Sequence, residues 1–160
     1  KIALAALAVS AATYASMPGQ FVYFGILHAI ATFSLIGLGF LRLRVSVLLV
    51  CAILVVVAPH VLRSEAFNAP ALWWLGLSTQ TARTMDFEPL FPWFAAFLFG
   101  MAAAQAAKTG GGLKQARRYS PGAYGHLKGA FLWAGRHTLI LYLVHQPVLI
   151  ALIWAATFLI

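Results

Sequence analysis

The fold of this chain is decided by the stretch Gly135-Arg136-His137-Thr138-Leu139-Ile140-Leu141-Tyr142-Leu143-Val144-His145-Gln146-Pro147, which an almost wholly apolar run follows to Ile160. A charged start leads into a segment that is apolar enough for a membrane helix but carries polar and ionisable side chains. Such side chains are costly inside a bilayer and usually face a bundle interior or a water-filled site. Residues three and four apart are neighbours on a helix, so Thr138, Tyr142, His145 and Gln146 form one polar stripe. We interpret this stripe as one wall of a buried site.

The composition indicates an integral membrane protein. The 160 residues are 62% hydrophobic and 9% charged, whereas a soluble domain is about half apolar and about one quarter charged. The length allows about five spans of about 20 residues but no soluble domain as well. We therefore predict an all-α, polytopic transmembrane helix bundle that forms a single membrane domain over residues 1–160. The apolar start is interpreted as a helix of a longer domain whose first helices are missing, in preference to a signal peptide.

Breakers and charges divide the chain into five predicted spans. These are residues 2–16, 21–41, 45–62, 89–107, and a last span that starts near 130 or 136 and runs to 160. Residues 63–88 are mixed in character and contain the pair Trp73-Trp74. Because amphipathic rings favour the headgroup level, we expect this segment to lie on the membrane surface, with a short helix.

The distribution of Lys and Arg predicts the orientation. With alternating spans, nine of the 11 basic residues share one side and two share the other. The nine are Lys1, Arg42, Arg44, Lys108, Lys114, Arg117, Arg118, Lys128 and Arg136, and the two are Arg63 and Arg83. The positive-inside rule places the larger set in the cytoplasm, so the C-terminus is periplasmic. Basic residues that bracket apolar runs do not form a nucleic-acid surface, and we exclude that partner.

His28 and His145 are the predicted catalytic residues. Each lies roughly 10 to 13 Å from the end of its span at 1.5 Å per residue, so both can approach the bilayer middle. Histidine suits a general base because its unperturbed pKa of about 6.5 lets it accept and return a proton near neutrality. A structural role is the alternative for each, and the sequence does not choose between the two residues.

Three further residues are predicted to bind substrate, each with a structural alternative. Gln146 could instead satisfy the backbone carbonyl that Pro147 frees. Tyr142 could donate to a developing oxyanion, although a hydrogen bond across helices is the favoured interpretation for it alone. Asp86, with Glu88, lies just before the span at 89–107. A favourable interaction with the helix dipole is preferred for both carboxylates, and recognition of a polar acceptor is the alternative.

The cytoplasmic basic residues Arg136, Arg117 and Arg118 are predicted to contact an anionic donor, because Arg pairs with phosphates bidentately. For Arg117 and Arg118, anchoring of the topology is the favoured alternative. Gly110-Gly111-Gly112 lacks the Walker spacing and is better explained as a flexible linker. No metal-ligand cluster appears in the sequence.

Three stretches resemble the bacterial membrane acyltransferase-like family related to heparan-alpha-glucosaminide N-acetyltransferase, its catalytic-domain family. They are Tyr23-Phe24-Gly25-Ile26-Leu27-His28-Ala29-Ile30-Ala31, then Pro89-Leu90-Phe91-Pro92-Trp93-Phe94 with Gly100, and the stretch quoted at the outset. The resemblance covers nearly the whole chain and corresponds to the C-terminal part of the family domain. The first family helices, with an Asp-x-Leu-Arg-Gly-type motif and the histidine proposed to act in acetyl transfer, have no counterpart here. His28 and His145 match family motif positions, and a catalytic role for them is our inference.

The resemblance implies a bacterial inner-membrane enzyme that moves an acyl group, acetyl above all, from cytoplasmic acetyl-CoA or another acyl-CoA to a glycan or small polar acceptor outside. The implied partners are the lipid bilayer, the two substrates and the missing helices, and a homo-oligomer stays open. The alternative is a small-molecule or lipid-linked substrate transporter or flippase-like protein whose polar stripes line a path. Transporters tend to show paired broken helices, and only the last predicted span has an obvious break.

Overall fold

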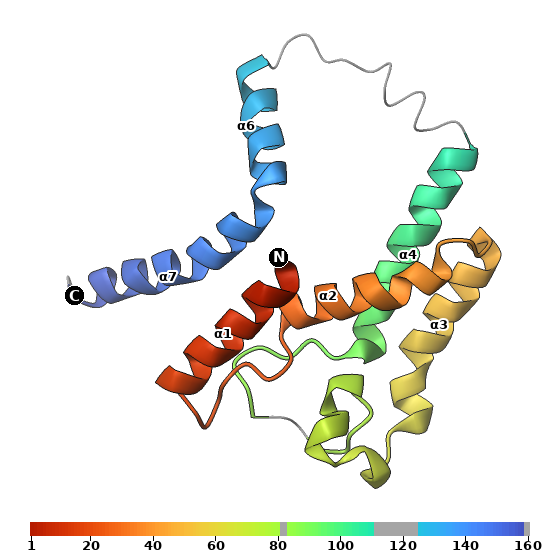
Figure 1. Cartoon of the computed structure of the whole chain (residues 1–160), viewed down its shortest axis with the longest axis horizontal. Coiled ribbons are helices and arrows are strands. Elements are labelled where there is room, and N and C mark those ends of the chain that lie inside the picture. The colour runs from red at the N-terminus through yellow and green to blue at the C-terminus, as the bar shows by residue number, and fades with distance from the viewer. Residues whose placement is uncertain (81–82, 111–124, 159–160) are drawn as a thin grey trace. The chain divides into compact units, whose positions relative to one another are not determined.

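The computed structural model describes residues 1–80, 83–110 and 125–158, with side chains at all of these positions except 125–128, 146, 147 and 150. The described residues form α-helices, short 3-10 helices (η) and connections, and no strand occurs among them (Figure 1). The all-α prediction is thereby confirmed. The helices are, in chain order, α1 (Ile2–Ser16), α2 (Ile26–Gly37), η1 (Leu38–Phe40), α3 (Val45–Leu62), η2 (Glu65–Phe67), η3 (Pro70–Leu75), α4 (Leu90–Thr109), α6 (Gly125–Arg136) and α7 (Thr138–Thr157).

The chain divides into two compact units, Lys1–Gln115 and Ala116–Ile160. In the first unit α3 and α4 lie side by side and run in opposite directions, with the start of α3 near the end of α4 (Figure 1). Leu48 and Leu98 are fully buried at the centre of this unit, beside Ala52 and Ala95. Small residues let two membrane helices approach closely, and these alanines explain the tight α3–α4 pair.

Helix α2 packs against α4 through aromatic side chains. The rings of Phe33 and Phe94 lie 5.4 Å apart between centroids. Gly37 admits the ring of Phe97, since a Cβ at position 37 would lie 2.9 Å from Phe97 Cζ. Helix α1 contacts α2. The apolar residues of α2 are therefore divided between α1 and α4.

Two helices among the described residues, α3 and α4, are long and apolar enough to cross a membrane. Helices α1 and Ile26–Phe40 are apolar but shorter. At 1.5 Å per residue, a 15-residue helix reaches about 22 Å, less than the roughly 30 Å of a hydrocarbon core. The predicted count of five spans, the periplasmic C-terminus and the single membrane domain stay predictions.

The predicted span at 21–41 is wrong at its start, because the helix begins only at Ile26. The preceding residues are extended and pair with the segment before α4. Met85 N–H donates to the Gln20 carbonyl and Glu88 N–H to the Phe24 carbonyl, each at 3.0 Å. Phe24 and Phe87 form an isolated parallel bridge. These hydrogen bonds hold residues 20–24 out of the helix.

The connection from α3 to α4 contains the short helices η2 and η3, so the predicted short helix in this segment is confirmed, in 3-10 form. Gly76 ends η3 with φ +81°, a left-handed conformation that favours glycine. Its position leaves no room for a side chain, since a Cβ there would lie 2.8 Å from Pro89 Cβ and would also meet the Phe91 carbonyl oxygen. Glycine thus lets η3 pack on the start of α4.

The second unit consists of α6 and α7, which are separated at His137. The prediction expected a break within the last span at Pro147. The backbone of α7 instead stays helical from Thr138 to Thr157, and the interruption lies at His137, with φ −115° and ψ 23°. The last predicted span is therefore divided at His137, next to the start that the sequence placed near Arg136.

Candidate functional site

His28 lies in the first turns of α2, and one hydrogen bond identifies its tautomer. Its Nε2 is 3.2 Å from Ser10 Oγ on α1, and the same Oγ donates its proton to the Val22 carbonyl at 2.6 Å. A hydroxyl has one proton, so Ser10 accepts from His28 and Nε2 carries the hydrogen. The neutral ring therefore has its lone pair on Nδ1.

That lone pair has no partner in the described part of the chain. His28 Nδ1 is buried and makes no hydrogen bond. Most buried polar atoms in proteins are hydrogen-bonded, and an exception calls for a specific explanation. The ring of Phe24 lies beside the imidazole, with 5.7 Å between centroids. A basic nitrogen that is oriented but unpaired is suited to accept a proton from a ligand.

A cavity of about 360 Å³ adjoins this position. It is lined by Tyr23, Phe24, Thr32 and Trp74. Thr32 lies one turn after His28 on α2, and residues four apart share a helix face. The Phe24 ring thus lines this cavity and also lies beside the imidazole of His28.

Asp86 reaches the same region as a helix cap. Its Oδ2 accepts a hydrogen bond from Ile26 N–H at 2.9 Å, at the N-terminus of α2. The sequence predicts a favourable interaction of this carboxylate with the dipole of the following helix, α4. The start of α4, however, receives no side-chain cap. Asp86 instead stabilises α2, the helix that carries His28. The predicted role in substrate binding stays a prediction.

Glu88 lies two residues after Asp86, in the same connection before α4. Partial burial raises the pKa of the Glu88 carboxyl above its ordinary value, and the negative charge of Asp86 adds to that rise. Burial and the charge of Asp86 thus both disfavour the ionised form of Glu88 near the start of α2.

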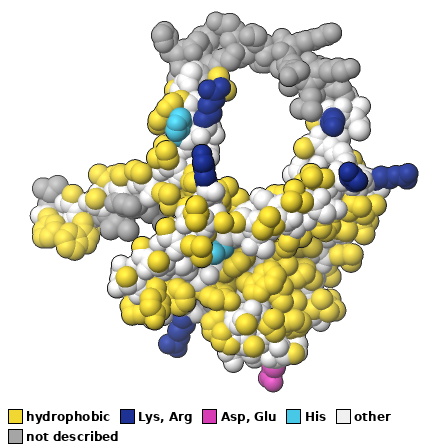
Figure 2. All heavy atoms as spheres, in the orientation of Figure 1, with side chains coloured by type: hydrophobic (Ala, Val, Ile, Leu, Met, Phe, Trp, Pro, Cys, Tyr) yellow, Lys and Arg dark blue, Asp and Glu magenta, His cyan; other side chains and the backbone are white. Residues whose placement is uncertain are grey.

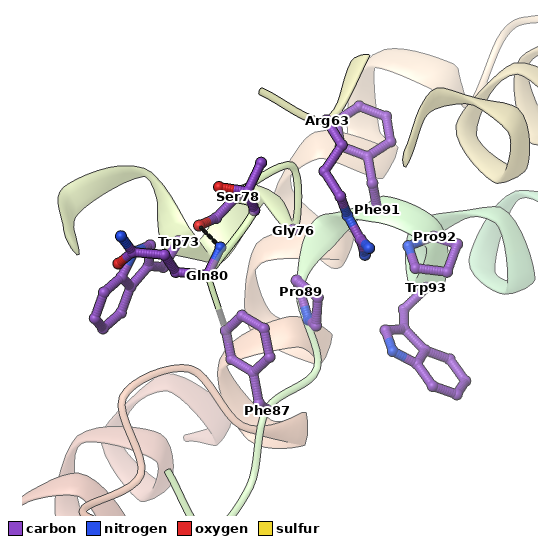
Figure 3. Close-up of a pocket in the computed structure, with 11 residues that line it drawn as sticks. Arg63, Trp73, Gly76, Ser78, Gln80, Phe87, Pro89, Phe91, Pro92 and Trp93 are labelled. Carbon is purple, nitrogen blue, oxygen red and sulfur yellow. Dashed lines mark hydrogen bonds between the residues drawn. The ribbon is translucent and has the colours of Figure 1, made fainter. Parts of the chain in front are cut away.

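A second pocket, the Trp73–Trp93 pocket, lies where α3 ends and α4 begins, with a volume of about 300 Å³. Its lining combines the two tryptophans with Arg63, Ser78 and Gln80. In Figure 3 the Arg63 side chain extends past Phe91 toward Pro92, and Ser78 and Gln80 lie on the side of Trp73. Aromatic faces with a few converging polar groups are the usual lining of a small-molecule site.

Asn68 holds the polar wall of this pocket in place. Its Oδ1 accepts from Ser78 Oγ at 2.8 Å and from both Thr79 N–H and Thr79 Oγ1 at 3.0 Å. Trp73 Nε1 donates to the Asn68 carbonyl at 2.9 Å. The sequence does not reveal this pocket, because its residues come from three separate stretches of the chain. The Trp73-Trp74 pair and the polar run after it were the available signal.

The second unit carries Tyr142, His145 and Arg136. His145 Nδ1 lies 2.5 Å from the Tyr142 carbonyl oxygen, which can only accept. Nδ1 therefore carries the proton, and the lone pair of neutral His145 is on Nε2. The rings of Tyr142 and His145 lie 5.4 Å apart between centroids, and the predicted stripe with Thr138 and Gln146 stays a prediction. Arg136 ends α6.

Other predicted site residues lie outside the described part of the chain. Arg117 and Arg118 fall between α4 and α6, and the side chain of Gln146 is not described. His28 and Asp86 belong to the first unit, whereas His145 and Tyr142 belong to the second. The prediction that the two histidines line one pocket stays a prediction. Among the described residues, no group of three or more His, Cys, Asp or Glu could hold a metal ion.

A comparison with protein families matches residues 1–147 to the family "Heparan-alpha-glucosaminide N-acetyltransferase, catalytic". The chain belongs to this family. The match includes His28, Asp86, the Trp73–Trp93 pocket and the stripe from Tyr142 to Gln146, and the resemblance inferred from the sequence is confirmed. Comparisons with curated proteins and with solved structures give no match.

Membership in the heparan-alpha-glucosaminide N-acetyltransferase catalytic family has two consequences. The family is one of membrane-associated, acyltransferase-type enzymes, and α3 and α4 supply two helices suited to a membrane. The family in general uses acetyl-CoA as donor, a substrate that agrees with the predicted chemistry.

Proposed function

We propose that this chain forms part of an inner-membrane acyltransferase in which His28 is the general base. The enzyme would move an acetyl or other acyl group from cytoplasmic acyl-CoA to a hydroxyl or amine of a glycan or small polar acceptor on the outer side. Family membership supports the reaction type. The observation that carries the role of His28 is its buried, unpaired Nδ1, which the Ser10 contact keeps unprotonated in the neutral ring.

One base is enough for the proposed acyl transfer, because the proton taken from the acceptor is returned to the leaving thiolate. His28 Nδ1 takes the proton of the acceptor O–H or N–H as the acceptor attacks the thioester carbonyl carbon. The carbon–sulfur bond of the tetrahedral intermediate then breaks. The departing thiolate takes the proton back from the imidazolium, which leaves an ester or amide and free CoA. A general base of this kind contributes about 10²- to 10⁴-fold to the rate.

The Trp73–Trp93 pocket is the proposed site for the part of the acceptor that does not react. Indole faces can stack on a sugar ring, and Ser78 and Gln80 can hydrogen-bond to its hydroxyls. The pocket is linked to the region of the base through the backbone. Phe87 lines the pocket, and its backbone forms a bridge with that of Phe24, whose ring lies beside His28.

The second unit keeps the roles predicted from its sequence. Tyr142 is proposed to donate to the oxyanion of the tetrahedral intermediate, and Gln146 to position the acceptor. Arg136, Arg117 and Arg118 are proposed to bind phosphates of the CoA donor. His145 is the competing base, since its Nε2 also carries a lone pair.

The test uses the full-length protein in inverted membrane vesicles, with acetyl-CoA labelled in the acetyl group and a panel of sugar and amino-sugar acceptors. His28→Gln is the decisive variant, because its side-chain amide can still donate to Ser10 Oγ while the basic nitrogen is lost. His145→Gln tests the competing base. His60→Gln, at an exposed position near the end of α3, is the matched control.

We expect acetyl transfer with CoA release, a loss of 10²-fold or more in His28→Gln, and no change in His60→Gln. Full turnover in His28→Gln would remove His28 as the base while the transferase assignment stays. Absence of CoA turnover across the whole panel would overturn the transferase in favour of the transporter alternative.

A further inference from the structure

A pocket rich in positive charge lies at the opposite end of the α3–α4 pair from the Trp73–Trp93 pocket. This basic pocket has a volume of about 570 Å³, and its lining includes Arg42, Arg44, Val45, Gln105, Lys108 and Thr109. The arginines come from the connection between η1 and α3, and the other polar residues from the last turns of α4. None of these residues has a role in the acyl transfer proposed above.

The three cations of the basic pocket have no acidic partner. The sequence contains three acidic residues, Glu65, Asp86 and Glu88, and all of them lie in the connection between α3 and α4, at the other end of the pair. In Figure 2 dark blue side chains gather where α3 starts and α4 ends, whereas the magenta side chain lies beyond the other end of α3. Like charges that share a pocket repel one another unless an anion joins them.

The start of α3 also favours an anion in the basic pocket. The N-terminus of a helix carries a partial positive charge and exposes N–H groups without an intrahelical partner. Helix α3 has no side-chain cap and no acidic residue in its first turn. Its N-cap residue is Arg44, a cation at the helix end where negative charge is favoured. The pocket thus combines three cationic side chains with an uncapped helix start.

The side chain of Gln105, which lines the basic pocket, also lacks a hydrogen-bond partner. Its Oε1 is buried and makes no hydrogen bond in the described part of the chain. Rotation of the carboxamide by 180° exchanges oxygen and nitrogen, so the same position can present N–H donors to a ligand. Thr109 Oγ1 donates to the carbonyl of Gln105 at 3.1 Å and closes the end of the helix.

We propose that the basic pocket binds a phosphate group, with Arg42, Arg44 and Lys108 as its cationic ligands. Arginine pairs with phosphate oxygens bidentately, and lysine acts as a point charge. The start of α3 adds backbone N–H donors. This site is independent of the proposed acyl transfer.

A bilayer phospholipid is the favoured source of this phosphate. Aliphatic side chains are exposed on α3 directly after the pocket, among them Leu49, Val50, Ile53 and Leu54. A lipid whose head group occupies the pocket would lay its acyl chains along this face, so a single ligand satisfies both the charges and the apolar surface. A soluble organic phosphate has the same head-group chemistry but cannot cover the helix.

The test measures binding rather than turnover, so its result does not depend on the proposed enzyme activity. Full-length protein is placed in nanodiscs of phosphatidylcholine with increasing phosphatidylglycerol, and lipid that stays bound after detergent extraction is measured by native mass spectrometry. A second arm titrates a soluble bisphosphate nucleotide at fixed lipid composition. The variant is Arg42→Gln/Arg44→Gln/Lys108→Gln, which changes only exposed side chains. The control is Arg63→Gln/Arg83→Gln, two exposed cations outside the basic pocket.

We expect the wild type and the control to retain phosphatidylglycerol, and the triple variant to lose at least tenfold in retention. Binding of the nucleotide alone, lost in the triple variant, would support the phosphate site and replace the lipid source with a soluble one. Equal retention of lipid and equal nucleotide binding in the wild type and the triple variant would overturn the proposal. Melting temperatures of both variants in phosphatidylcholine alone show whether each is folded.

Discussion

Asp86 Oδ2 accepts a hydrogen bond at 2.9 Å from the N–H of Ile26, 60 residues earlier in the chain. The N-cap position of α2 is Gly25, which has no side chain to cap the helix. A Cβ at position 25 would meet the Asp86 carboxylate and lie 2.8 Å from Val22 Cγ1. The carboxylate can reach the start of α2 only because the residue at the cap is glycine.

Loss of this distant cap is expected to destabilise the first unit. Removal of an N-cap acceptor typically costs about 1 kcal/mol, so Asp86→Ala should lower the free energy of unfolding by about that amount. Asp86→Asn keeps an amide oxygen and should lose less. Unfolding in detergent, followed by circular dichroism, measures both variants. Glu65→Ala is the control, since Glu65 is an exposed acid in η2. Equal stability of Asp86→Ala and wild type would contradict the capping role.

Gly25→Ala should be more harmful than the loss of Asp86, and the two changes should be coupled. The added methyl group displaces the carboxylate and also crowds Val22. In a double-mutant cycle, Asp86→Ala should relieve part of the cost of Gly25→Ala, with a coupling energy of about 0.5 to 3 kcal/mol, as is usual for residues in contact. Strictly additive effects would show that the two positions do not interact.

The helices could be predicted from the sequence because their signals are local. The apolar run ending at Leu62 and the polar residues on either side predicted α3 at its observed limits. Pro18 and Gly19 marked the end of α1. The start of α2 was misplaced because residues 21–24 are as apolar as a membrane helix, and only the pairing of residues 20–24 with residues 84–88 keeps them extended. A pairing between segments this far apart produces no periodic pattern in the sequence.

The candidate site was predictable only residue by residue. His28 stood out as an ionisable group in an apolar segment. Its partner Ser10 did not, because a serine in an alanine-rich helix has no distinctive pattern, and the contact joins residues 18 apart. Asp86 was recognised as a carboxylate near a helix start, but adjacency in sequence pointed to α4 and the hydrogen bond goes to α2.

Two glycines should respond in opposite directions to alanine. Gly76 has φ +81°, and a Cβ there would collide with the start of α4, so Gly76→Ala should destabilise the protein by at least the 1 to 3 kcal/mol typical of such strain. Gly100 lies within α4 with open space around it, and Gly100→Ala should stabilise the helix by about 0.5 to 1 kcal/mol. Chemical denaturation measures both. A neutral Gly76→Ala would mean that η3 does not pack on α4 as described.

Glu88 should make stability depend on pH in the acidic range. Its pKa in the folded state lies above the ordinary value of 4.5, so the folded protein binds a proton that the unfolded chain would release. The free energy of unfolding therefore rises as pH falls from 7 through this raised pKa. Above this pKa Glu88 is ionised in the folded state, and its full destabilising effect is present. Glu88→Gln should have a higher melting temperature than wild type at pH 7, and this difference should shrink toward pH 4.5. A constant difference across the range would contradict the shift.

Ser10→Ala should impair catalysis through the tautomer of His28. Without the Ser10 oxygen, the Nε2–H loses its acceptor, so more rings carry the proton on Nδ1 and fewer can act as base. A net hydrogen bond of about 0.5 to 1.5 kcal/mol predicts a tautomer ratio shifted by roughly twofold to tenfold toward the inactive form, and therefore a lower kcat with the acceptor KM unchanged. Nitrogen-15 NMR of labelled histidine should show Nε2 protonated in wild type and a tautomer mixture in the variant. Ser10→Thr should restore both values, whereas Ser16→Ala, at an exposed serine of the same helix, should change neither. An unaltered tautomer in Ser10→Ala would mean that another group orients His28.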